Sequence, residues 1–196
     1  MPTAISSDRE RNWEEALLML RSERQEIIRY LLRLHRDAWR VRPVNGGWNV
    51  AQMLEHLIRC DRVWRRMLMV AIRTAPLFPS RERFLRSRLA QPFGHQPMKA
   101  SRLLGKPRGR MRRKAMVGAF DQTVQNFEYR IEQLSDRRRG QLRFYSPTVG
   151  IVGVADWLLL IHYHDVHHFD QMQRIVASLR KRGIPVERVM EETEEV

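Results

Sequence analysis

The sequence predicts an all-α protein folded as a four-helix bundle, and three observations lead to this. Apolar residues recur at intervals of three and four along four long stretches, which is the spacing of one face of an α-helix. No segment shows the sustained apolar and polar alternation of a β-strand. The chain has 196 residues, 43% of them hydrophobic, which is enough for one sizeable core, so we expect a single domain over residues 1–196.

Start and stop signals bound the four expected helices. Ser7 and Glu10 have the spacing of a capping box before the first helix, and Asn49 with Gln52 forms a similar cap before the second. Gly183, followed closely by a proline, ends the fourth helix. The expected ranges are 8–36, 50–74, 113–137 and 154–182.

The positive charge of the chain is concentrated in one segment. The formal net charge is +14, and residues 81–114 carry twelve Lys or Arg residues against one acid, Glu82. Prolines and glycines interrupt this segment, so we interpret it as a long basic connection between the second and third helices, with a short helix near 81–89. Residues 187–196 are predicted to form an acidic tail.

Composition also limits the expected location. No apolar run approaches the roughly 20 residues needed to cross a bilayer, and the first residues have no apolar stretch after a basic region, as a secretory signal would. Cys60 is the only cysteine, so an internal disulfide cannot form, which agrees with a reducing compartment. We therefore expect a cytoplasmic protein.

Histidines cluster in the fourth helix, where the stretch "HYHDVHHFDQ" at 162–171 contains four of the seven in the chain. Residues three and four apart share a helix face, so His164 and His168 lie one above the other in an apolar row and are expected to point into the bundle. His162 and His167 lie on flanking rows and should point elsewhere. A pair at this spacing can chelate one metal ion.

A third histidine, His56, lies on the apolar stripe of the second helix. Three neutral imidazoles leave a coordination position open for water or substrate, as in catalytic divalent metal sites. An inward histidine is also commonly a hydrogen-bonded core residue. The residues alone leave a metal site and a set of core histidines both open.

Two stretches resemble the DinB/YfiT-like metalloenzymes. In "GGWNVAQMLEHLIRCDRVW" a Trp and a helix cap precede a histidine in an HL pair, and "SPTVGIVGVADWLLLIHYHDVHHFDQMQRI" is similar to the last bundle helix of that family. The resemblance implies an up-down-down-up bundle, often homodimeric, that holds a divalent ion such as nickel or zinc. It implies that the ligands are His56, His164 and His168. Some members of the family use low-molecular-weight thiols.

Other residues are weaker candidates for chemistry. Gln171 could orient a ligand or a bound water from outside the ligand set, and Asp165 could hydrogen-bond a histidine. Asp165 and Glu55 are otherwise expected to be solvated, with Glu55 paired to Arg59 one turn later. Cys60 is expected to be a small core residue.

These observations support a metal-dependent enzyme in which the ion activates water or a thiol for hydrolysis or thiol-dependent transfer of a small-molecule substrate. No general base stands out.

The alternative is a non-enzymatic bundle that binds nucleic acid or an anionic partner through the segment 81–114, although this segment has few aromatic residues and no recognised readout motif. A bundle that has lost its chemistry is a third possibility. The anion-binding candidates are Lys106, Arg108, Arg110, Arg112, Arg113 and Lys114.

Overall fold

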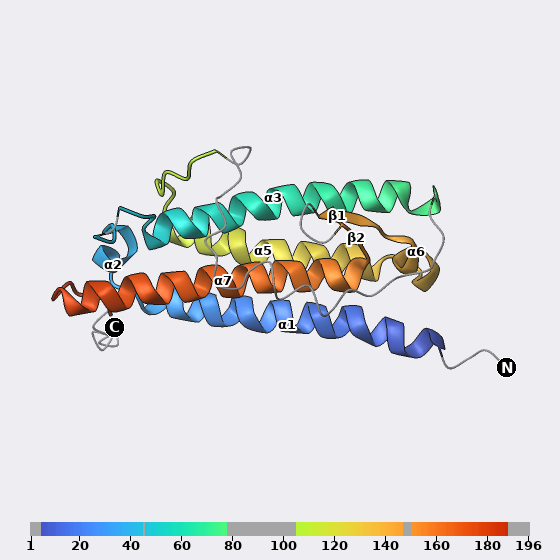
Figure 1. Cartoon of the computed structure of the whole chain (residues 1–196), viewed down its shortest axis with the longest axis horizontal. Coiled ribbons are helices and arrows are strands. Elements are labelled where there is room, and N and C mark those ends of the chain that lie inside the picture. The colour runs from blue at the N-terminus through green and yellow to red at the C-terminus, as the bar shows by residue number, and fades with distance from the viewer. Residues whose placement is uncertain (1–4, 45, 78–104, 147–149, 188–196) are drawn as a thin grey trace, which may run out of the picture.

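The four long helices pack as a bundle. The computed structural model describes residues 5–44, 46–77, 105–146 and 150–187. In Figure 1, α1 and α7 run in one direction while α3 and α5 run in the other, which is the predicted up-down-down-up order. The bounds of these helices are Ile5–Arg33 for α1, Val50–Thr74 for α3, Arg113–Glu132 for α5 and Val154–Lys181 for α7.

Two small strands were not predicted. The strands β1 (Phe144–Ser146) and β2 (Gly150–Val152) pair antiparallel, with Phe144 opposite Val152. Each strand has 3 residues, which is too short for an alternating pattern to be recognised in the sequence. The hairpin lies at the end of the bundle where α7 begins (Figure 1).

The second helix matches its predicted range because its start is strongly capped. The Asn49 side chain accepts the Gln52 backbone N–H at 2.9 Å, and the Gln52 side chain accepts the Asn49 backbone N–H at 3.1 Å. This reciprocal capping box satisfies two amide groups that a helix start leaves unpaired. The helix gives way to a short 3₁₀ helix, η1 (Ala75–Leu77).

The first and third helices differ from their predicted ranges. The predicted cap at Ser7 is wrong, because α1 already begins at Ile5. It ends at Arg33, after which His35 caps a separate short helix, α2 (Arg36–Arg40). Similarly, α5 ends before the predicted limit, and Ser135 caps the short helix α6 (Asp136–Gln141).

The fourth helix ends at the predicted glycine. Gly183 has a φ of 72°, a conformation that glycine adopts without steric cost. Its N–H donates to the Arg180 carbonyl at 3.0 Å, and the Ile184 N–H donates to the Leu179 carbonyl at 3.1 Å. This pair of bonds is a Schellman motif, which satisfies the last carbonyl groups of α7.

The hydrophobic core has two parts. One lies toward the hairpin and includes Leu20 and Ile161, and the other lies toward α2 and includes Ile27 and Phe169. On α1 and α7 the residues between these pairs include buried charged ones, so a polar layer interrupts the apolar interior. Within the described ranges, no helix is both long and apolar enough to span a membrane.

Only part of the predicted basic connection can be described. Residues 81–104, including the short helix expected near 81–89, lie outside the described residues. Residues 105–112 precede α5 without regular secondary structure. Of the predicted acidic tail 187–196, only Glu187 is described, and it forms an ion pair with Arg180 of α7.

Candidate metal centre

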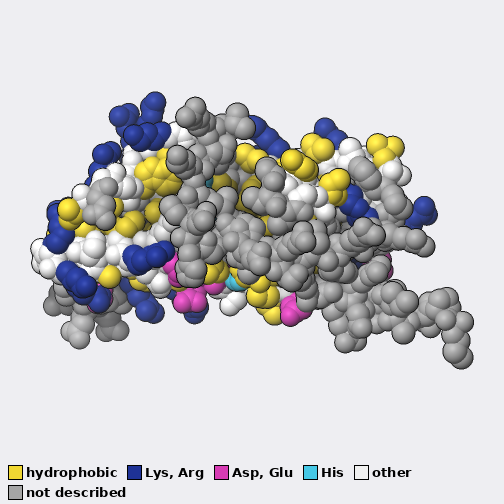
Figure 2. Space-filling view, in the orientation of Figure 1, with side chains coloured by type: hydrophobic (Ala, Val, Ile, Leu, Met, Phe, Trp, Pro, Cys, Tyr) yellow, Lys and Arg dark blue, Asp and Glu magenta, His cyan; other side chains and the backbone are white. Residues whose placement is uncertain are grey.

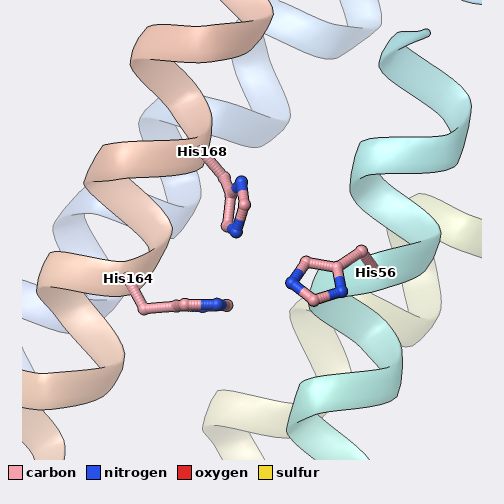
Figure 3. Close-up of side chains that lie close together, drawn as sticks. All are labelled: His56, His164 and His168. Carbon is pink, nitrogen blue, oxygen red and sulfur yellow. The ribbon is translucent and has the colours of Figure 1, made fainter. Parts of the chain in front are cut away.

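Three histidines from two helices meet in the bundle interior. His56 extends from α3 toward α7, while His164 and His168 extend from α7 toward α3 (Figure 3). One nitrogen from each imidazole lies within 4.8 Å of the others. Among the residues that the structure describes, these three histidines are the group of side chains whose spacing suits a metal ion. The ring centroids of His56 lie 5.5 Å from His164 and 4.8 Å from His168.

The positions of the three histidines on α3 and α7 explain why their side chains lie together. Because α7 is continuous from Val154 to Lys181, His164 and His168 are one turn apart on the same face. His56 is only 4% exposed and lies in the second turn after the Asn49 cap. Neither His162 nor His167 belongs to the group of three.

The three imidazoles are held in the neutral form that a metal requires. Burial, followed by the neighbouring imidazole and the Arg59 charge, lowers the pKa of His56 to about 4. Burial is also the main reason that the pKa of His164 falls to about 3 and that of His168 to about 2. At neutral pH each ring therefore offers a lone pair, as metal ligation demands. Two ligand nitrogens on a tetrahedral zinc lie roughly 3.4 Å apart, so small side-chain movements would bring these nitrogens to that spacing.

Hydrogen bonds select the nitrogen that His168 presents. The His168 Nδ1–H donates to Gln171 Oε1 at 2.9 Å, and the Gln171 amide donates to His167 Nε2 at 2.8 Å. Because Nδ1 carries the proton, the lone pair of His168 is on Nε2. A partner that fixes the tautomer in this way is typical of histidines that bind metals.

Two carboxylates expected in solvent are buried. Asp165 is 1% exposed and Glu55 is 8% exposed, so the prediction that they are solvated is wrong. Asp165 Oδ1 lies 3.9 Å from His164 Nδ1, too far for a hydrogen bond, and its other oxygen accepts Arg24 Nε–H at 2.7 Å. Glu55 pairs with Arg59 as expected.

Two indole rings and the thiol of Cys60, which is buried as expected, surround the histidines. The ring of Trp48 lies 5.1 Å from that of His56, and the ring of Trp64 lies 5.2 Å from that of His164. Cys60 Sγ lies 3.5 Å from His56 Nε2 and 3.9 Å from His164 Nε2. Burial raises the pKa of the Cys60 thiol to about 12, so it is protonated at neutral pH. Residues 56, 60 and 64 are one turn apart on α3, so Cys60 and Trp64 share a helix face with His56.

The described end of the basic segment is fixed against α3, next to His56. Glu55 Oε2 accepts the backbone N–H groups of Arg108 at 2.9 Å and Gly109 at 2.5 Å, and the Gln52 amide donates to the Pro107 carbonyl at 3.2 Å. Hydrogen bonding to these amides and to Arg59 lowers the pKa of Glu55, although burial opposes the shift. Figure 2 shows Lys and Arg side chains gathered over this segment and the start of α3.

Arg113 differs from the other anion-binding candidates. Its guanidinium donates to the carbonyl groups of Leu34 at 2.7 Å and Leu31 at 2.5 Å, and so it caps the end of α1. These bonds hold the Arg113 side chain against α1. The exposed members of that set are Lys106, Arg108, Arg110, Arg112 and Lys114.

The fold and the site define a four-helix bundle with a group of three histidines in its interior. The model of the DinB superfamily matches residues 19–172 of the sequence, and the chain belongs to this superfamily. Its structure is similar to that of YfiT from Bacillus subtilis, which is described as a probable metal-dependent hydrolase with an unusual four-helix bundle topology. The two share 14% sequence identity with a TM-score of 0.57, and the match covers 88% of each chain. No curated protein matches the sequence.

Proposed function

We propose that this protein is a metal-dependent enzyme, with a divalent ion such as nickel or zinc bound by His56, His164 and His168. The observation that carries the proposal is the convergence of three neutral imidazoles, each with one nitrogen within 4.8 Å of the others. The description of YfiT as a probable metal-dependent hydrolase agrees with it. The reaction that we propose is hydrolysis, or transfer that depends on a low-molecular-weight thiol.

When bound, the ion would supply Lewis-acid chemistry that generates a nucleophile from water or a thiol near neutral pH. The residues of the chain prepare the site for that chemistry. Gln171 holds the His168 tautomer, and the indole rings of Trp48 and Trp64 pack beside the imidazoles of His56 and His164. These apolar walls limit the access of solvent to the centre, which strengthens electrostatic interactions within it.

The partners follow from the same proposal. We infer that the substrate is a small molecule, because the three-histidine group is in the bundle interior and His56 is 4% exposed. We also propose a homodimer in the cytoplasm, which rests on the resemblance to the family and on the composition of the chain.

Metal analysis tests the proposal directly. The protein, purified without a histidine tag, is expected to contain, or to take up from zinc or nickel solutions, one ion per chain. His168→Ala should abolish this binding, whereas His162→Ala, on the same helix but outside the group, should retain it. A folded wild-type protein that takes up neither metal would refute the proposal.

A second candidate function is supported by the fixed position of the basic segment. Because Glu55 anchors the backbone at Arg108 and Gly109, the side chains of Lys106, Arg108 and Arg110 are presented to solvent from an ordered backbone. Such a group can neutralise phosphates of a nucleic acid. Titration with labelled DNA and RNA at two salt concentrations tests this function. An absence of binding at low salt would exclude it without affecting the metal site.

A further inference from the structure

The bundle interior contains a charged network that the proposed chemistry does not use. Arg24 of α1 is 0% exposed, and Asp61 of α3 and Asp165 of α7 are 2% and 1% exposed. The Arg24 guanidinium donates to Asp61 Oδ1 at 2.6 Å, to Asp61 Oδ2 at 3.1 Å and to Asp165 Oδ2 at 2.7 Å. It also donates to the Phe120 carbonyl of α5 at 3.2 Å. One side chain of α1 therefore bonds to the three other helices of the bundle.

Stability alone is a weak explanation for this network. Removing three charges from water is costly. Replacing a buried ion cluster with well-packed apolar residues often leaves the stability of a protein unchanged or increases it. The apolar clusters on both sides show that this interior can be filled with hydrophobic side chains. A charged layer at this level of the bundle therefore calls for a role in addition to holding the helices together.

The network adjoins the three-histidine group on both of its helices. Asp165 directly follows His164 on α7, and its Oδ1 lies 3.9 Å from the imidazole Nδ1. Asp61 directly follows Cys60 on α3, whose Sγ lies 3.5 Å from His56 Nε2. Both carboxylates that Arg24 binds are therefore next in sequence to a residue at the site: Asp165 follows a histidine of the group, and Asp61 follows a cysteine that contacts the group.

Helix packing makes such a link necessary. α7 packs mainly against α1, and α3 packs mainly against α5, while α3 and α7 contact each other far less. The two helices that carry the histidines are therefore not held at a fixed distance by close backbone packing. Side chains between them must set how far His56 lies from His164 and His168, and Arg24 bonds to both helices at this level.

We propose that Arg24 is a positioning residue for the metal centre. By bridging Asp61 and Asp165 it fixes the spacing and rotation of α3 and α7, so that the three imidazoles can reach one ion. The planar guanidinium is essential because it bonds two carboxylates in defined directions at once, whereas a Lys ammonium acts as a point charge. This inference rests on the proposed metal site.

The test compares Arg24→Lys with a matched control in the full-length protein. Arg113→Lys is the control, because Arg113 also ties helices together through its guanidinium, but at the end of α1. For each protein, zinc affinity is measured by competition with a chromophoric chelator, the Co²⁺-loaded form is examined by visible absorption, and thermal unfolding is followed without metal. The absorption spectrum reports ligand geometry, which a general loss of stability does not change.

Arg24→Lys is expected to weaken zinc binding about tenfold or more and to alter the Co²⁺ spectrum at a temperature where the protein is folded. Arg113→Lys should lower the unfolding temperature but leave the zinc affinity and the spectrum unchanged. Wild-type zinc affinity and spectrum in folded Arg24→Lys would overturn the role of Arg24 while leaving the metal site intact. A wild-type protein that binds no zinc would overturn both proposals.

A second variant covers the case in which Arg24→Lys does not fold. Asp61→Asn keeps the shape of the side chain but removes one of the two charges that Arg24 bridges. Zinc binding in this variant is expected to weaken in the same direction, with a smaller change in the Co²⁺ spectrum. Unchanged zinc affinity in folded Asp61→Asn would overturn the proposal.

Discussion

Acid should destabilise the metal-free protein through its buried histidines, and His168 provides the clearest measurement. Its pKa is lowered from 6.5 to about 2, mainly by burial and then by the neighbouring His164 and His56. Because the pKa is lower in the folded state, the unfolded chain takes up the proton first as the pH falls. The free energy of unfolding therefore decreases below about pH 6.5.

The magnitude follows from the unfolded pKa. At about pH 5.5 the unfolded imidazole is mostly protonated while the folded His168 remains neutral, which costs about 1.4 kcal/mol of stability relative to a pH well above 6.5. The value depends only on His168 staying unprotonated in the folded state at this pH. Other groups oppose the trend, since burial raises the pKa of Asp61 to about 6, so a difference between two proteins is needed.

The assay is urea unfolding of wild type and His168→Gln, both stripped of metal, at about pH 7.5 and about pH 5.5. Between these pH values the wild type is expected to lose about 1.4 kcal/mol more than the variant, because the variant lacks one group that binds a proton on unfolding. If the free energy of unfolding changes equally with pH in the two proteins, the inference that His168 is buried as a neutral imidazole is refuted. The pH dependence that remains in the variant combines the losses from His56 and His164 with the opposing contribution of Asp61.

Four further predictions concern single residues. Gly109→Ala places a Cβ 3.1 Å from Gln52 Cγ at a φ of +66°, so thermal unfolding should show a loss of about 1–2 kcal/mol. Gly118→Ala, on an open face of α5, should raise stability by up to about 1 kcal/mol. Gln171→Ala removes the acceptor from the His168 Nδ1–H, and zinc affinity measured by chelator competition should fall about tenfold. Asn49→Ala removes the α3 cap and should lower the free energy of unfolding in urea by about 1 kcal/mol.

The fold was predictable where local signals are strong at both ends of a helix. The range of α3 agrees with its prediction because Asn49 and Gln52 cap its start and Pro76 limits its end. The limits of α1 and α5 could not be predicted as well, because His35 and Ser135 each restart the chain as a separate short helix. Helix propensity is only a weak preference, so the residue at which such a helix ends is decided by packing against the rest of the molecule.

The candidate site was predictable as far as helix periodicity extends. The row that contains His164 and His168 follows from residue spacing within one helix, and the structure brings this pair together with His56. Which chain segment packs against α3 beside His56 does not follow from periodicity. The anchoring of Arg108 and Gly109 by Glu55 joins residues more than fifty positions apart through a backbone turn, and no helical pattern encodes such a contact.

The charged network could have been predicted from the charged residues that interrupt the apolar stripes of three helices. Arg24 takes an apolar-stripe position on α1, four residues after Leu20 and three before Ile27. Asp61 and Asp165 interrupt the stripes of α3 and α7 in the same way. A charge on an inward face is too costly to bury alone, so opposite charges on the inward faces of three helices imply that they pair. The helices must then align so that these residues share one level, and that alignment places His164, the neighbour of Asp165, opposite the face of α3 that carries His56.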